Sequence, residues 1–226
     1  MIEIEAADGR KFAAYQTAPA EDAKGTVILL GEGAQNFADA FAGNGFVALV
    51  PMPPVDEGDD ALGQALADVQ ACVDYAKGKG KIAVVGYGPG GYLAYRAGYD
   101  VQGIACTIGY YADGVAADRR SKCKVPTLLH FGSADYQIPF EDVTQLRFNR
   151  PDISVFDYPA GHNFDLEGSE NYNPQAASLA QERTLSWVSQ FVVGQPPVQL
   201  KNAGAYAQAK VEKKKKKPAG DDLGPE

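Results

Sequence analysis

The sequence has no apolar run close to the length of about 18 residues that a membrane-spanning helix requires, so it predicts no membrane span. Its N-terminus alternates acidic and apolar residues instead of placing basic residues before an apolar core, and we therefore expect no secretory signal. Only three cysteines occur, Cys72, Cys106 and Cys123, an odd number without the spacing of metal ligands. We expect no metal site. We interpret Cys72 and Cys106, which lie in apolar stretches, as buried reduced thiols, and this favours a cytoplasmic location.

Positive charge is also scarce. The chain has 21 Lys and Arg against 29 Asp and Glu, a net charge of −8. Residues 210–226 hold six lysines and four acids, a balance of +2, so residues 1–209 carry −10. An acidic body argues against nucleic-acid binding as the main activity. The run Lys213 to Lys217 would attract an anionic partner, but we interpret residues 195–226 as a solvated, flexible tail with nothing to pack.

What the sequence does contain is an alternation of strand-like and helix-like segments within residues 1–194. The apolar and alternating runs predict strands at 1–5, 11–16, 26–30, 46–50, 82–86, 103–108, 126–131 and 153–157. Helical patterns lie at 36–44, 60–77, from Pro89 onward, 140–148 and 174–193. This order predicts a single α/β domain with a mostly parallel sheet and helices on both faces, preceded by a short hairpin. We expect the Pro51/Pro53/Pro54 cluster to stop the fourth strand.

The most informative stretch joins an apolar strand to a helix through glycines. It reads Gly86-Tyr87-Gly88-Pro89-Gly90-Gly91. This is the setting of a nucleophile elbow, G-x-nucleophile-x-G, in which small flanking residues let the turn be tight and the helix approach the strand. The central residue normally presents Ser or Cys, but here it is Gly88. The turn lacks the spacing and the lysine of a phosphate-binding P-loop and follows a middle strand rather than the first, so we disfavour that alternative.

The residue after the nucleophile position matters equally, because its backbone N–H is normally one donor of the oxyanion hole. That residue is Pro89, which has no N–H. Loss of a triad nucleophile costs on the order of 10⁶ in turnover, and loss of one oxyanion donor costs roughly 10² to 10³. Either loss would disable ordinary acyl transfer.

The other parts of a catalytic triad are present in the order expected of α/β-hydrolases, with an acid and then a histidine after the elbow. Asp135 follows an apolar strand, and His162 lies in a loop after the next strand. Asp135 would orient His162 and set its tautomer. The other histidine, His130, lies within an apolar strand and is interpreted as a buried, hydrogen-bonded residue.

Residues 81–111 and 178–185 resemble the dienelactone hydrolases, or carboxymethylenebutenolidases, and the likeness extends over roughly residues 1–193. These are cofactor-free α/β-hydrolases that open small unsaturated lactones with a Cys-His-Asp triad. The resemblance implies that Asp135 and His162 are the acid and base. It also implies that Glu32, in Gly31-Glu32-Gly33, is the glutamate that helps to activate the thiol, and that the missing cysteine falls on Gly88. No cofactor is expected.

Two further departures concern the substrate. The family binds a substrate carboxylate with arginines, one of them shortly after the catalytic histidine. The corresponding position here lies near Asp165-Leu166, and the chain has no arginine between Arg10 and Arg96. An anionic lactone is therefore a poor match. Tyr110 and Tyr111 are further candidates to line the cleft, whereas Tyr87 is expected to pack beneath the turn.

Three functions stay open from the sequence. The first is a catalytically silent member that binds a small molecule or a protein in the old cleft above Gly88. The second is an enzyme in which the His162–Asp135 pair, with Glu32, acts as a general base for slow hydrolysis or proton transfer. The third is a non-catalytic interaction protein that uses its lysine tail. We expect a monomer or a small homo-oligomer.

Overall fold

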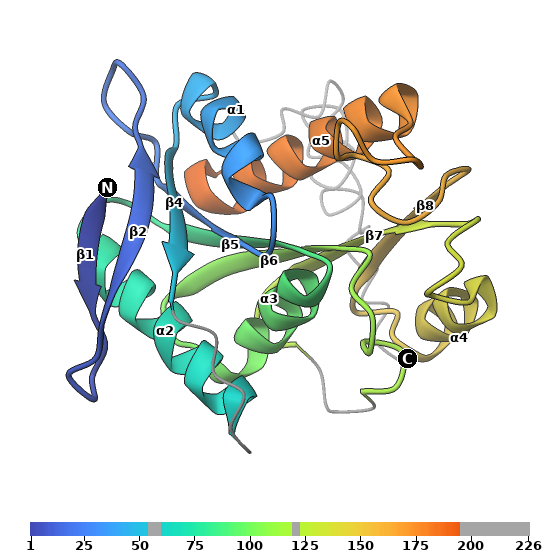
Figure 1. Cartoon of the computed structure of the whole chain (residues 1–226), viewed down its shortest axis with the longest axis horizontal. Helices are drawn as coiled ribbons and strands as arrows, with labels where there is room; N and C mark the ends of the chain where they lie inside the picture. The colour runs from blue at the N-terminus through green and yellow to red at the C-terminus, as the bar shows by residue number, and fades with distance from the viewer. Residues whose placement is uncertain (54–59, 119–122, 195–226) are drawn as a thin grey trace, which may run out of the picture. The chain divides into compact units, whose positions relative to one another are not determined.

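One eight-stranded sheet with helices on both faces makes up the described part of the chain, as seen in a computed structural model (Figure 1). The structure describes residues 1–53, 60–118 and 123–194. The expectations for residues 195–226, including the Lys213 to Lys217 run, and for Pro54 lie outside these residues. All the described helices and strands belong to one unit, Met1–Gly194, so the predicted single α/β domain is confirmed.

The helices and strands follow the predicted order. The strands are β1 (Ile2–Glu5), β2 (Lys11–Thr17), β3 (Thr26–Leu30), β4 (Val47–Met52), β5 (Ile82–Tyr87), β6 (Ile104–Tyr110), β7 (Thr127–Gly132) and β8 (Ser154–Tyr158). The α-helices are α1 (Ala38–Gly43), α2 (Ala61–Ala76), α3 (Pro89–Asp100), α4 (Phe140–Asn149) and α5 (Pro174–Val188). A 3-10 turn, η1 (Ala34–Phe37), precedes α1, and a π-helical turn, η2 (Ser189–Val193), follows α5.

The strand order is β1-β2-β4-β3-β5-β6-β7-β8. β1 and β2 form the predicted antiparallel hairpin, and β2 pairs antiparallel with β4. All pairings from β4 to β8 are parallel. Because parallel strands end at the same edge, the loops after β3, β5, β6, β7 and β8 meet there, and this is where open α/β sheets bind ligands.

Alternating strand residues supply two separate cores. On one face Val27 and Leu29 of β3 pack with α1 and α5, and on the other Ile28 and Leu30 pack with α2 and α3. Figure 1 shows α1 and α5 together on one side of the sheet and α2 and α3 on the other. Every residue of β3 and β5 is buried, as expected for central strands covered on both faces.

The prediction that the proline cluster stops the fourth strand is wrong by two residues. β4 continues through Pro51 to Met52, and Pro51 pairs with Ala14 of β2. The pairing of β4 with β3 ends at Leu49, so Pro51 pairs with one neighbouring strand only, β2. A proline is tolerated there because one side of the strand carries no ladder at that point.

The two thiols predicted to be buried, Cys72 and Cys106, are fully buried and free, and Cys123 is half-buried and free. Burial raises the pKa of both Cys72 and Cys106 to about 12, so both stay protonated at neutral pH. No helix in the described part of the chain is long and apolar enough to cross a membrane.

Candidate active site

The elbow, residues 86–91, connects β5 directly to α3. Gly88 has φ 55° and ψ −123°, a conformation that residues with a Cβ adopt only under strain. Pro89 begins α3 at its first position, where its fixed φ suits a helix and its missing N–H breaks no helical bond. The same missing N–H removes a donor from the space in front of Gly88.

Three other glycines allow the elbow to pack. A Cβ added at Gly86 would lie within 1.9 Å of the Gly90 carbonyl oxygen, and one at Gly90 within 2.4 Å of the Leu30 carbonyl oxygen. A Cβ at Gly91 would approach the Tyr110 carbonyl oxygen to 2.6 Å. The sequence motif therefore has a steric cause, because β3, β5, β6 and α3 meet here with no room for side chains.

Gly88 differs from these three. An added Cβ would have only the Tyr111 ring near it, at 3.8 Å, which is ordinary van der Waals contact. A side chain therefore fits the space in front of Gly88, and the glycine there is not required by packing. Only the positive φ would oppose a substitution.

Asp135 and His162 are brought together by neighbouring strands. β7 and β8 pair in parallel up to Gly132 and Tyr158, and their following loops are joined by hydrogen bonds from the Ser133 and Ala134 N–H groups to the Tyr158 and Ala160 carbonyls. His162 Nδ1 lies 2.8 Å from Asp135 Oδ2. Asp135 Oδ1 accepts the N–H groups of Gln137 and Ile138, at 2.8 and 3.3 Å.

The Asp135 side chain is fully buried, while His162 retains a small exposed surface. The acid is thus held by three donors and is closed to solvent, and the imidazole alone faces outward. This is the arrangement in which an aspartate orients a histidine and stabilises its protonated form.

The space in front of the elbow is a cleft of about 640 Å³. It is lined by Glu32, Gly33, Asn36, Phe37, Tyr87, Gly88, Pro89, Tyr111, His162, Asn163, Leu166, Glu167, Gly168 and Ser169. Six of the nine predicted site residues line it, and Asp135, Gly86 and Gly90 lie behind its wall, at the positions already described. Glu32 is exposed, and Gly33 has φ 74° at the start of η1. The cleft lies at the carboxyl edge of the sheet, where the strand order predicted it.

Tyr111 is the side chain closest to the vacant position. Its backbone φ is +35°, and its N–H donates to the His130 carbonyl oxygen at 2.7 Å. Its ring lies 4.8 Å from the His162 ring, centre to centre. A positive φ at a tyrosine is a strained conformation, whereas the φ of +56° at Asn163 in the same cleft is one that asparagine adopts readily. The sequence suggested that Tyr111 lines the cleft, but contained no signal for its backbone strain.

Asp165 was missed as a functional candidate. It is 8% exposed, and its Oδ1 has no hydrogen-bond partner within the described residues. Burial raises the pKa of Asp165 to about 6, and the neighbouring Tyr111 hydroxyl and His162 offset part of that rise. Asp165 borders a second cavity of about 30 Å³, the rear cavity, which shares Phe37 and Tyr87 with the cleft. Its spacing from His162 was visible in the sequence, but its burial was not.

The remaining aromatic candidates are structural. Tyr87 is buried and stacks on Phe37 at 4.4 Å, as expected for a residue beneath the turn. Tyr110 does not line the cleft; its hydroxyl lies 2.7 Å from Thr184 Oγ1. His130 is fully buried between Tyr158 and Thr184, at 2.8 and 3.0 Å, and burial lowers its pKa to about 3. The interpretation of His130 as a buried, hydrogen-bonded residue is confirmed.

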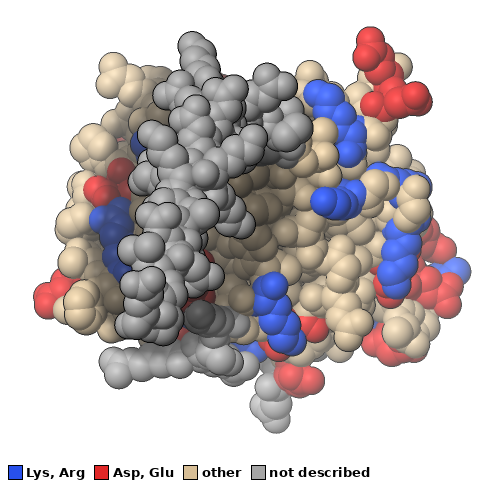
Figure 2. Space-filling view, turned by 180° about the vertical axis from the view of Figure 1, so that it is seen from behind, with Lys and Arg blue, Asp and Glu red and all other residues tan. Residues whose placement is uncertain are grey.

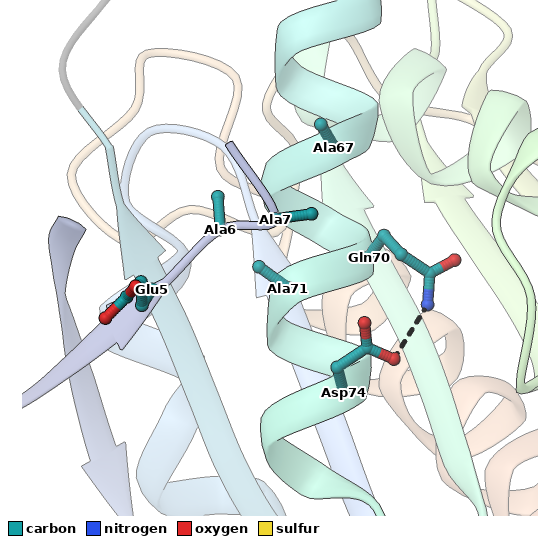
Figure 3. Close-up of a pocket in the computed structure, with 7 residues that line it drawn as sticks. All are labelled: Glu5, Ala6, Ala7, Ala67, Gln70, Ala71 and Asp74. Carbon is teal, nitrogen blue, oxygen red and sulfur yellow. Dashed lines mark hydrogen bonds between the residues drawn. The ribbon is translucent and has the colours of Figure 1, made fainter. Parts of the chain in front are cut away.

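Other surfaces of the molecule offer less. A shallow groove of about 420 Å³ between the end of β1 and α2 is walled mainly by alanines (Figure 3). Of its polar side chains, Glu5 lies 3.8 Å from Lys11, and Gln70 and Asp74 bond to each other, and Gln70 also binds the backbone of Gln102. Basic side chains on the visible part of the rear face are scattered and form no single patch (Figure 2). In the described part of the chain, no cluster of His, Cys, Asp or Glu could hold a metal ion.

The elbow after the central parallel strand β5, together with an acid after β7 and a histidine after β8, defines an α/β-hydrolase fold. The model of the Dienelactone hydrolase family matches residues 54–192, more than half of the sequence. The chain therefore belongs to the dienelactone hydrolase family.

A relative supports this assignment, and solved structures share the fold. A carboxymethylenebutenolidase of Pseudomonas sp. (strain P51) is 30% identical over 228 aligned positions, which cover 84% of this chain and 94% of that protein. A Klebsiella pneumoniae protein assigned to the dienelactone hydrolases has a TM-score of 0.72 at 19% identity, covering 84% of this chain and 98% of that one. Thermogutta terrifontis esterase 2, phosphorylated by paraoxon, has a TM-score of 0.63 at 18% identity, covering 85% and 94%. At these identities the two structures support the fold alone.

Proposed function

We propose that this chain is a member of the dienelactone hydrolase family that no longer performs acyl transfer through the elbow and that binds a small molecule in the cleft. The observation that carries the proposal is the pairing of Gly88 with Pro89. The first lacks any attacking atom, and the second lacks the N–H that would stabilise a tetrahedral oxyanion.

The geometry around Gly88 supports a specific loss rather than a collapsed site. Room for a side chain remains beside Tyr111, the 2.8 Å contact of His162 with Asp135 is intact, and the cleft is open. The chain is similar to a protein named for the hydrolysis of a lactone, a carboxymethylenebutenolidase, and within the expected triad and oxyanion hole it departs at Gly88 and Pro89.

Turnover of p-nitrophenyl acetate and of simple lactones by the purified chain tests the proposal. We expect no hydrolysis above the background rate. Because paraoxon phosphorylates the Thermogutta esterase, intact-mass measurement after paraoxon treatment is a second test, and we expect no adduct. Rapid turnover that disappears in His162→Ala, or a covalent adduct in the elbow, would refute the proposal.

A second candidate function rests on the His162–Asp135 contact. A neutral His162 that donates its Nδ1–H to Asp135 presents an unprotonated Nε2, which can take a proton from water or from a substrate C–H group. Slow hydrolysis that is lost in His162→Ala and Asp135→Asn, with no covalent intermediate in the mass spectrum, would favour this function over simple binding.

A further inference from the structure

We propose that the cleft selects a small organic cation, an amine or quaternary ammonium compound with an apolar body; this inference rests on the proposed function and specifies its ligand. The charged groups that line the cleft are Glu32 and Glu167, and none of its lining residues is Lys or Arg. Both glutamates are exposed at its mouth. An anion entering this space would meet two like charges and no counter-charge.

The floor of the cleft is aromatic. Tyr87 and Tyr111 are almost completely buried apart from the surface that borders the cleft. Tyr87 packs against the rings of Phe37 and Tyr110, at 4.4 and 4.9 Å, so Phe37 and Tyr111 are the rings that can offer a face to a ligand. Aromatic faces attract organic cations because the ring carries negative potential above its plane, and the attraction increases when the cation is partly shielded from water. A ring floor beneath a carboxylate rim therefore matches a ligand whose charged group is joined to an apolar body.

A third carboxylate lies behind this floor. Asp165 is 8% exposed, its Oδ1 has no hydrogen-bond partner within the described residues, and it borders the rear cavity that shares Phe37 and Tyr87 with the cleft. Asp165 thus keeps one carboxylate oxygen without a donor, its carboxyl group also interacts with the Tyr111 hydroxyl and His162, and it adjoins the aromatic residues of the cleft. A cation in the cleft would be attracted by Asp165 as well as by the two glutamates.

The vacant elbow adds space where the ligand would lie. Gly88 borders the cleft beside His162, and with no side chain at residue 88 the cleft reaches the backbone of the turn. The missing side chain at residue 88 and the proposed preference for a cation therefore concern the same cleft. The first enlarges the cleft, and the second determines which ligand it accepts.

Calorimetric titration of the full chain with three probes tests this proposal. Benzyltrimethylammonium, benzyl alcohol and benzoate share a ring and differ in charge. We expect the cation to bind about tenfold more tightly than benzoate, with an affinity that falls as salt is added. Equal affinities for the two ions, or no saturable binding of the cation at millimolar concentration, would overturn the proposal.

Matched variants locate the effect. Glu167→Gln should weaken binding of the cation about two- to fivefold and leave benzyl alcohol unaffected, because a partly exposed ion pair is worth at most about 1 kcal/mol. Glu170→Gln, an exposed acid outside the cleft, should change neither. Glu32→Gln in the cleft should likewise weaken binding of the cation, and Asp39→Asn, an exposed acid outside the cleft, is its control. Equal effects of the cleft and control variants would refute the assignment of the cation to the cleft.

The titration and the turnover assay can refute their two proposals separately. Ester hydrolysis by the unmodified chain would refute the proposed loss of acyl transfer. The preference for a cation would then still be decided by the binding measurement. Absence of that preference would leave the silenced elbow unaffected.

Discussion

His162 Nδ1 lies 2.8 Å from Asp135 Oδ2, in a chain whose elbow offers this pair no nucleophile to activate. The pair is held as firmly as a working acid and base would be, because two backbone N–H groups also bind the carboxylate. Under the proposed loss of the nucleophile at Gly88, the contact of His162 with Asp135 would be kept, and restoration of a nucleophile is therefore a direct test of the proposal.

Restoring the nucleophile should require two substitutions. Gly88→Cys should fold, at a cost of about 1–3 kcal/mol for a side chain at φ 55°, and should hydrolyse p-nitrophenyl acetate only weakly. Adding Pro89→Leu restores an N–H, and we expect it to raise turnover about 100- to 1000-fold. The rate of p-nitrophenyl acetate hydrolysis by the single and double variants measures this difference. The triple variant with His162→Ala should return to background, and equal rates in the single and double variants would contradict the oxyanion argument.

Gly90→Ala should severely destabilise the fold. Its Cβ would lie 2.4 Å from the Leu30 carbonyl oxygen, a backbone atom that cannot move away without disrupting β3. We expect a loss of about 3 kcal/mol or more in the free energy of unfolding, measured by urea denaturation. Gly43→Ala is the control: nothing lies within 4 Å of its Cβ, and the substitution should be neutral or slightly stabilising. Similar losses in both variants would show that the steric explanation of the elbow is wrong.

Asp135→Ala should cost about 2–4 kcal/mol of stability whether or not the chain is an enzyme. The substitution leaves the Gln137 and Ile138 N–H groups and His162 Nδ1 without their shared acceptor in a buried site. Asp39→Ala, at an exposed position of α1, should change stability by no more than about 0.5 kcal/mol. Thermal and urea denaturation compare the two, and an equally small effect at Asp135 would mean that the carboxylate is not the structural acceptor described above.

Asp165→Asn should stabilise the protein near pH 7.5 and should stabilise it clearly less near pH 4.5. Because burial raises the pKa of Asp165 to about 6, against about 3.9 in an unfolded chain, the folded state binds a proton that the unfolded state has lost between these values. Stability contributed by this group is therefore highest in acid and falls as pH rises through about 6. Asparagine stays neutral, so the variant should gain about 1–3 kcal/mol at pH 7.5. Paired urea titrations at the two pH values measure this difference, and an equal effect at both would contradict it.

The local pattern of the chain was enough to predict most of the fold. The apolar runs 26–30 and 82–86 became β3 and β5 with one residue of difference, because central strands are buried on both faces and show this in their composition. The glycines of the elbow also predicted the tight turn from β5 to α3, since close backbone approach excludes every other residue at Gly86, Gly90 and Gly91. The order of elbow, acid and histidine followed from the strand-and-loop alternation.

Contacts between distant segments could not be predicted from the sequence in the same way. Nothing in the local pattern indicated that Pro51 would extend β4, because that depends on where the ladder with β3 ends. The position of Tyr111 beside Gly88 depends on the register of β5 with β6, and the burial of Asp165 depends on how its loop packs against Tyr111 and Phe37. These are long-range relationships, and a single sequence carries no periodicity that records them.

The absence of a side chain at residue 88 and of an N–H at residue 89 is a covalent property, and it could be read from the letters alone. Whether that absence leaves usable space, and what charge surrounds the space, required the folded chain. A glycine has no preference that reveals its neighbours. The ring of Tyr111, the carboxylates of Glu32 and Glu167 and the carboxyl of Asp165 are assembled only when the loops after β3, β6 and β8 meet at one edge of the sheet.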